Sequence, residues 1–271
     1  MSTGRCRESA VALGLAWDRA GMDSTTAPNP SWLAARIVDR VLARNGSLLT
    51  GRRTLWTADA MTALTRRLDR AARSAGETFA DRWRGVLRGA DDPAVLLAAE
   101  LLTVHLWFPD DLRHQTKRDL VTATLDRMRH PVRLPADVQA ALAQGVAGSG
   151  IAFTRRRLSQ LAFLARAVAA LKSRRPAQRR AALDDPWAWK ALLVDVPADG
   201  GQAQREVLLH LVHPDTFEPI VSTAVKRRIV DEHCDAVPAG LSDLDAQLAA
   251  IRAARLPGDP TRPLRELPPI T

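Results

Sequence analysis

Apolar residues recur every three to four positions along most of the chain, the spacing that places them on one face of an α-helix. Met61, Leu64 and Leu68 follow this spacing, and Thr57 before them is a residue type that caps helix N-termini. The pattern predicts helices over residues 32–43, 57–73, 78–87, 94–107, 110–128, 135–144, 154–172, 176–183, 186–194, 202–212, 223–230 and 241–255.

These segments predict a mainly α fold, an irregular multi-helix domain with at most a short hairpin. The hairpin would pair residues 47–49 with residues 55–56, which form either two short strands or a loop. The helix at 94–107 is apolar on nearly every side, so we expect it at the centre of the core.

The chain divides by composition into three parts. Residues 1–29 are expected to form a poorly ordered leader, with one short helix at 8–19. Residues 30–255 form the helical module, with a sub-boundary near 145–152, where glycines gather. Residues 256–271 contain five prolines and predict an extended, proline-rich tail.

The formal net charge of +9 favours an anionic partner, because phosphate contacts supply most non-specific affinity for nucleic acids. Arginine supplies nearly all of this charge, and lysine occurs only at Lys117, Lys172, Lys190 and Lys226. Such a bias is typical of GC-rich genomes, so the arginine count alone leaves a solvated basic surface as an equal alternative.

The cations are distributed unevenly, which is more informative than their number. Residues 138–183 contain no aspartate or glutamate but many cations, and two consecutive helices could present these as one strip that contacts nucleic-acid phosphates. A solvated face, or pairing with acids elsewhere in the fold, is the alternative. The candidate nucleic-acid-binding residues are Arg155, Arg156, Arg157, Arg166, Lys172, Arg174, Arg175, Arg179 and Arg180.

The sequence contains no recognisable catalytic or cofactor site. The glycine-rich stretch 145–150 lacks the following Lys-Ser/Thr of a phosphate-binding P-loop, so it indicates a structural turn. His210, His213, Asp215, His233 and Cys234 match no standard zinc spacing. We therefore expect no metal, no cofactor and no enzymatic activity.

Localisation follows from cysteine use and from the length of apolar runs. Cys6 and Cys234 lie in unrelated contexts and suggest no disulfide framework, which fits a reducing cytoplasm. The longest apolar run, residues 93–109, contains Glu100 and His105 and is too short to span a bilayer. No secretory signal or membrane association is expected.

One block of the sequence resembles a known family. The segments DPWAWK at 185–190 and QREVLLHLVHPDTFEPIVS at 204–222, with Lys226, resemble the N-terminal regions of actinobacterial McrB-like AAA ATPases, of the 5-methylcytosine-specific restriction enzyme B type. The HPDTFEPIVS run at 213–222 is the most specific part. Weaker matches bring the resemblance to about residues 31–255 and lie at 46–50, 56–57, 97–102, 116–118, 243–245 and 251–252.

The resemblance implies a module that recognises target DNA in restriction or defence, placed before an ATP- or GTP-driven motor. The chain ends where the motor would follow, so we expect no ATPase or restriction activity from it. Either it is a standalone or truncated paralogue, or the motor is supplied by another chain. The alternative is a protein-interaction module that docks a separate AAA ATPase without touching DNA. We expect the family-motif residues to be structural: Trp187, His213, Pro214, Asp215, Phe217, Glu218, Pro219 and Ser222.

Overall fold

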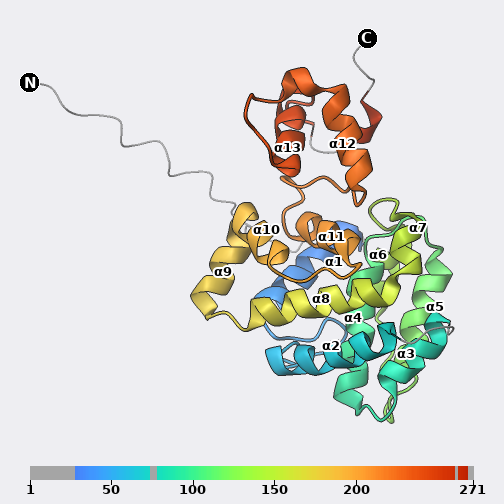
Figure 1. The fold of residues 1–271 in the computed structure, drawn as a ribbon. Helices are drawn as coiled ribbons and strands as arrows, with labels where there is room; N and C mark the ends of the chain where they lie inside the picture. The colour runs from blue at the N-terminus through green and yellow to red at the C-terminus, as the bar shows by residue number, and fades with distance from the viewer. Residues whose placement is uncertain (1–27, 74–77, 260–261, 268–271) are drawn as a thin grey trace, which may run out of the picture.

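α-Helices supply the regular structure of the computed structural model, which describes residues 28–73, 78–259 and 262–267. No strand forms within these ranges, and residues 44–57 are a loop rather than a hairpin, so the prediction of a mainly α fold is confirmed (Figure 1). The elements are α1 (Pro30–Arg36), a π-helical continuation η1 (Ile37–Ala43), α2 (Ala58–Ala72), α3 (Phe79–Leu87), α4 (Asp92–Leu106), α5 (His114–Leu125), α6 (Ala136–Gln144), α7 (Gly150–Arg155), α8 (Arg157–Lys172), α9 (Pro176–Asp184), α10 (Pro186–Val194), α11 (Gln202–Val212), α12 (Thr223–Glu232), η2 (Cys234–Ala236), α13 (Leu244–Arg255) and η3 (Leu264–Glu266).

The helices begin where capping residues precede the apolar spacing. The Thr57 hydroxyl accepts a hydrogen bond from the Ala60 amide at 3.2 Å, and the Asp91 carboxylate accepts one from the Ala94 amide at 3.0 Å. Both satisfy amides that have no partner inside the first turn of a helix. The predicted helix at 154–172 is two helices, because the backbone bends at Arg156 between α7 and α8.

Two helices form the centre of the large lobe, which comprises α1 to α11. Almost every residue of α4 from Val95 to Leu106 is buried, as its sequence predicted. In α8 the apolar residues are also buried nearly all round, and this helix packs against α2, α4 and α11. Figure 1 shows α8 crossing the middle of the lobe, with α2 and α3 below it.

The loop at 44–57 is attached to the core by a single carboxylate. Glu100, on α4 and fully buried, accepts hydrogen bonds from the Leu48 amide at 2.8 Å, the Leu49 amide at 2.9 Å and the Trp56 indole at 2.6 Å, and also from the Ser47 hydroxyl. Burial raises the pKa of Glu100, although all four hydrogen bonds act in the opposite direction.

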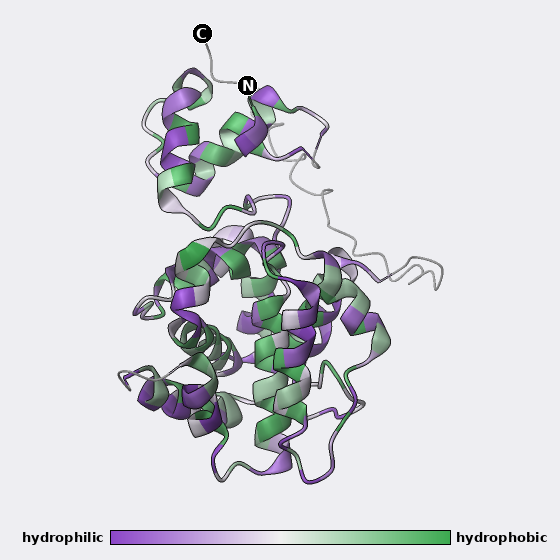
Figure 2. Ribbon diagram, turned by 90° about the vertical axis from the view of Figure 1, so that its right-hand side faces the viewer, coloured by the Kyte–Doolittle hydropathy of each residue, from purple (hydrophilic) through white to green (hydrophobic). Residues whose placement is uncertain are grey.

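The C-terminal helices form a small lobe with a core of its own. Figure 2 shows this lobe, α12 and α13, standing apart from the large lobe and joined to it by an irregular segment. Its buried apolar residues form a cluster separate from the main core: Ile220, Ile229, Leu248, Ile251, Leu256 and Leu264.

The two-core arrangement corrects the expected domain boundaries. Residues 145–152 do not separate cores, because Ala147 and Phe153 both belong to the main core. The turn there is fixed to residues 108–110: Gly145 has a φ of 68°, and a Cβ on it would lie 2.5 Å from the Pro109 carbonyl oxygen. The break lies near Ile220 instead. Within the predicted proline-rich tail, Leu256 and Leu264 are buried in the small lobe, and Leu264–Glu266 form η3.

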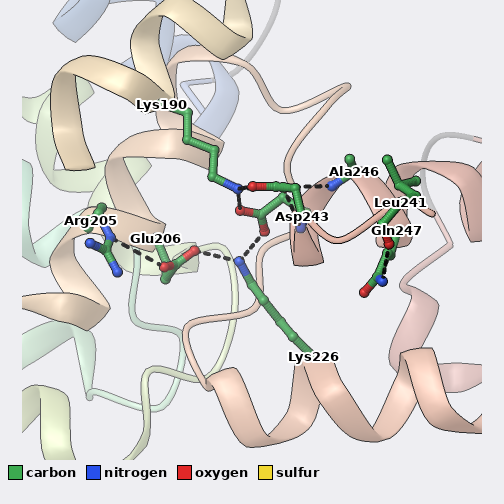
Figure 3. A network of polar contacts seen from close by, with 9 residues as sticks. Lys190, Arg205, Glu206, Lys226, Leu241, Asp243, Ala246 and Gln247 are labelled. Carbon is green, nitrogen blue, oxygen red and sulfur yellow. Dashed lines mark hydrogen bonds and ion pairs between the residues drawn. The ribbon is translucent and has the colours of Figure 1, made fainter. Parts of the chain in front are cut away.

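A network of ion pairs joins the lobes (Figure 3). The ammonium of Lys226, on α12, contacts the carboxylates of Glu206 on α11 and Asp245 on α13, the second at 2.5 Å. The ammonium of Lys190, on α10, lies 2.6 Å from both Asp243 and Asp245. Because Lys226 is 3% exposed and Asp245 is also buried, this network is shielded from solvent at its centre.

The 213–222 block forms the connection between the lobes. The Phe217 carbonyl contacts the His210 ring at 2.7 Å, and Glu218 accepts hydrogen bonds from the Arg252 guanidinium of α13, one of them at 2.9 Å. Phe217 also lies edge-on to Trp187, with ring centroids 5.6 Å apart. Trp187 is nevertheless 43% exposed, so it lies at the surface and not in the core.

Of the other family-motif residues, His213 is buried at the C-terminal end of α11 and Pro219 is partly exposed. Ser222 is exposed and caps α12, accepting a hydrogen bond from the Val225 amide. Pro214 and Asp215 are exposed in the turn.

Several predictions concern residues outside the described ranges, namely the leader with its helix at 8–19 and Cys6. Cys234 is described, and it is an exposed free cysteine. A search of the described helices for one with the length and apolar character needed to cross a bilayer finds none.

Candidate functional site

The predicted basic strip of residues 155–180 is not a continuous surface. Its clearest exception is Lys172, which is 7% exposed and donates hydrogen bonds to the carbonyl oxygens of Val41 at 2.5 Å, Leu42 at 2.8 Å and Arg44. Burial, aided by the nearby Arg179, lowers the pKa of Lys172 to about 7. This lysine caps the C-terminal end of η1, so its assignment as a phosphate contact is wrong.

Two arginines in the same stretch are committed to contacts within the fold. Arg166 pairs with Asp69 of α2 at 2.9 Å and with Asp199 at 3.5 Å. The guanidinium of Arg157 lies 4.7 Å from the centre of the Phe79 ring, a cation–π contact. The acid-free stretch is therefore neutralised partly by acids from other segments.

The remaining strip residues fall into two separate groups. Arg155 and Arg156 are exposed where α7 meets α8. The second group follows the other end of α8, where Arg175 and Arg180 are exposed and Arg174 and Arg179 are half-buried. The length of α8, roughly 24 Å for 16 residues, separates them, so they do not form one binding site.

A different set of arginines does converge, in a cleft between α2 and α3. The cleft has a volume of about 800 Å³. The two helices that form it, α2 and α3, lie at the end of the large lobe opposite the small lobe (Figure 1). Among the described residues that line it, six are arginines and one is an acid, Asp81. The arginines are Arg67 and Arg70 of α2, Arg82 and Arg84 of α3, Arg88 just after α3, and Arg127 after α5.

The apolar spacing of α2 and α3 directs these arginines into the cleft. Each helix has one buried apolar face, and Trp83 anchors α3 by donating a hydrogen bond from its indole to the Thr124 hydroxyl at 2.9 Å. The opposite face of each helix is left for charged residues. Two basic faces thus meet across the gap between the helices.

Internal contacts use only part of this positive charge. Asp81 pairs with Arg84 at 2.8 Å, and a hydrogen bond from the Thr78 hydroxyl, together with Arg84, lowers the pKa of Asp81, which keeps it ionised. Arg67 is held by the carbonyl oxygens of Val86 at 3.0 Å and Arg88 at 2.9 Å.

The other cleft arginines are open to a ligand. Arg70, Arg88 and Arg127 are exposed, and the Nε atom of Arg82 is buried without a hydrogen-bond partner. Guanidinium groups bind phosphate oxygens in bidentate fashion. Because several guanidinium groups face one cleft of about 800 Å³, the site suits a ligand with more than one phosphate.

The cleft could not be predicted from a local absence of acids in the sequence. The cleft arginines come from three segments that are separated in sequence, and acids such as Asp69 and Asp81 lie among them. The available signal is the polar face of α2: Arg70 lies on the side away from Met61, Leu64 and Leu68, and Arg67 lies at the edge of that apolar face.

Histidine, cysteine and acidic side chains do not gather into a metal site in the described part of the chain. His213 and His233 are buried, whereas Cys234 and Asp215 are exposed.

No protein-family model, curated protein or solved structure matches the chain. The arrangement of its own residues is therefore the basis for assigning a function.

Proposed function

We propose that the chain is a non-catalytic, cytoplasmic nucleic-acid-binding module, the DNA-recognition or adaptor component of a McrB-like restriction or defence system. One observation carries the proposal: the described residues that line one open cleft include six arginines and a single acid. The resemblance of residues 185–226 to the McrB-like family supplies the biological setting.

Charge favours nucleic acid as the occupant of this cleft. The net charge of +9 attracts polyanions over distance, and the cleft adds a local concentration of guanidinium groups. The described part of the surface has no strand or loop fingerprint for a mononucleotide phosphate, and a duplex or single strand would present several phosphates at once. In this proposal the cleft arginines contact phosphates and so position the nucleic-acid backbone on the protein.

Charge reversal in the cleft tests the proposal. The triple variant Arg70→Glu, Arg88→Glu and Arg127→Glu should bind a fluorescein-labelled DNA duplex about a hundredfold more weakly at near-physiological salt, because three phosphate contacts are lost. The measurement is fluorescence anisotropy, first at about 50 mM salt, where binding by the unaltered protein should be readily detected.

The matched control reverses three arginines of the predicted strip, Arg155→Glu, Arg156→Glu and Arg180→Glu. It changes the net charge by the same amount and should reduce affinity only slightly. The proposal fails if the unaltered protein binds no DNA at low salt, or if the two triple variants lose affinity equally.

The alternative function, docking of a separate AAA ATPase, has one observation in its favour. Trp187 and Val194 are 43% and 54% exposed and lie seven residues apart on α10, which places them on one face. Exposed tryptophan is a frequent anchor of protein interfaces. Capture of a P-loop ATPase from the host that is lost with Trp187→Glu, and kept in the cleft triple variant, would favour this function.

A further inference from the structure

A second, smaller pocket adjoins the arginine cleft. It has a volume of about 350 Å³, and Arg67 lines both cavities. Its walls come from α2, α3, the start of α4 and the end of the 44–57 loop. The larger side chains among them are aliphatic: Leu55, Leu64, Val86, Leu87 and Leu97.

The polar groups of this pocket are few and mostly engaged in capping helices. The Thr57 hydroxyl accepts a hydrogen bond from the Ala60 amide, and the Asp91 carboxylate accepts one from the Ala94 amide. None of the described residues that line the pocket is aromatic. A flat, polar group such as a nucleobase would therefore find no stacking surface and few hydrogen-bond partners, whereas an alkyl group would find contacts on most sides.

Arg67 marks the boundary between the apolar pocket and the basic cleft. Its Nη1 atom donates to the Val86 and Arg88 carbonyl oxygens, at 3.0 and 2.9 Å, which fixes the guanidinium at the C-terminal end of α3. The other nitrogens of the same guanidinium have no hydrogen-bond partner among the described residues, so they can serve a ligand. A positive charge is thus held at the edge of an aliphatic pocket.

We infer that the pocket and Arg67 together bind an amphipathic anion, a small molecule with an anionic head such as a phosphate and a short aliphatic tail. The head contacts Arg67 at the edge of the cleft, and the tail enters the pocket between α2, α3 and α4. This ligand differs from nucleic acid, and its binding does not depend on the proposed function.

A series of n-alkyl phosphates, from methyl to octyl phosphate, measures this binding directly by isothermal titration calorimetry. Each methylene that enters the pocket should lower the Kd about fourfold, the gain expected for burying one such group. The Kd should stop falling once the pocket is full. An equal Kd for every member of the series would overturn the inference.

Two variants separate the head site from the tail site. Ala63 is exposed on α2 and lines the pocket, so Ala63→Leu should fill it, remove the dependence on chain length and leave the affinity for methyl phosphate unchanged. Arg67→Gln should weaken every member by the same factor and keep the dependence on chain length. Circular dichroism of both variants checks that they fold.

The matched control is Ala123→Leu, the same change at an exposed position on α5 that lines neither cavity. It should bind the whole series as the unaltered protein does. A chain-length dependence that survives Ala63→Leu would place the tail elsewhere and overturn the inference. The inference would also be overturned if nucleoside monophosphates bound more tightly than octyl phosphate and if Ala63→Leu abolished this difference in affinity. Loss of DNA binding by itself would count only against the proposed function.

Discussion

Replacing Glu100 with alanine is expected to lower the free energy of unfolding by at least about 4 kcal/mol, because four buried donors lose their acceptor and each unsatisfied one costs about 1–3 kcal/mol. Urea denaturation measures this loss. Hydrogen exchange should also show that the amides of Leu48 and Leu49 lose protection, since only Glu100 accepts their hydrogen bonds.

The isosteric change Glu100→Gln tests whether both carboxylate oxygens are needed as acceptors. Each carboxylate oxygen of Glu100 accepts from two donors, so an amide nitrogen in either position faces at least one N–H group that it cannot satisfy. We expect a loss of about 1–3 kcal/mol for this variant. The control is the exposed Glu232→Ala, which should change stability by less than about 0.5 kcal/mol. Equal stability of Glu100→Ala and Glu232→Ala would contradict the role assigned to Glu100.

Replacing Lys226 with methionine should cost about 3–5 kcal/mol and loosen the small lobe, because removing one partner leaves buried charge uncompensated. Glu206 would keep only a distant partner, Arg205 at 3.7 Å, whereas Asp245 would retain Lys190. Limited proteolysis should then cut the connection at residues 213–222 faster, and thermal unfolding should show a separate, earlier transition for the small lobe.

The control is Arg227→Met, a neighbouring change at an exposed position on α12. It should leave both the proteolysis rate and the unfolding transition unchanged. If Lys226→Met behaves like this control, the network does not hold the lobes together.

The stability that this ion-pair network contributes should fall at strongly acidic and at strongly alkaline pH. Burial alone would raise the pKa of Asp245, but Lys226 and Lys190 outweigh it and lower that pKa. The contribution of Asp245 to the free energy of unfolding is therefore present above the normal aspartate pKa, near 4. It is lost as the pH falls through the lowered pKa of Asp245. For Lys226, burial is outweighed by Glu206 and Asp245, which raise its pKa, so its contribution is lost only at strongly alkaline pH.

The helices could be predicted from the sequence because their signals are local. Spacing of apolar residues and caps such as Thr57 and Asp91 depend on neighbours within a few positions. The bend at Arg156 and the separate core of the small lobe could not be predicted in this way, because they depend on which apolar faces meet in three dimensions.

The candidate site was hidden for a related reason. In this arginine-rich chain, all four lysines are buried or ion-paired: Lys172 and Lys117 donate to carbonyl oxygens at the ends of other helices, and Lys190 and Lys226 join the lobes. The acid-free stretch at 138–183 therefore contains a lysine, Lys172, that belongs to the protein interior and not to a binding surface. The cleft arginines come together through the packing of α2 against α3 and through the placement of the segment after α5 beside them.

The salt dependence of DNA affinity tests the central claim most directly, since it counts the phosphates that the protein neutralises. For the unaltered protein, a plot of log Kobs against log salt concentration should be steep, and the slope for the variant Arg70→Gln, Arg88→Gln and Arg127→Gln should be flatter by about 0.9 per lost phosphate contact. An unchanged slope in this variant, with a flatter one in Arg155→Gln, Arg156→Gln and Arg180→Gln, would contradict the assignment of the cleft as the nucleic-acid site.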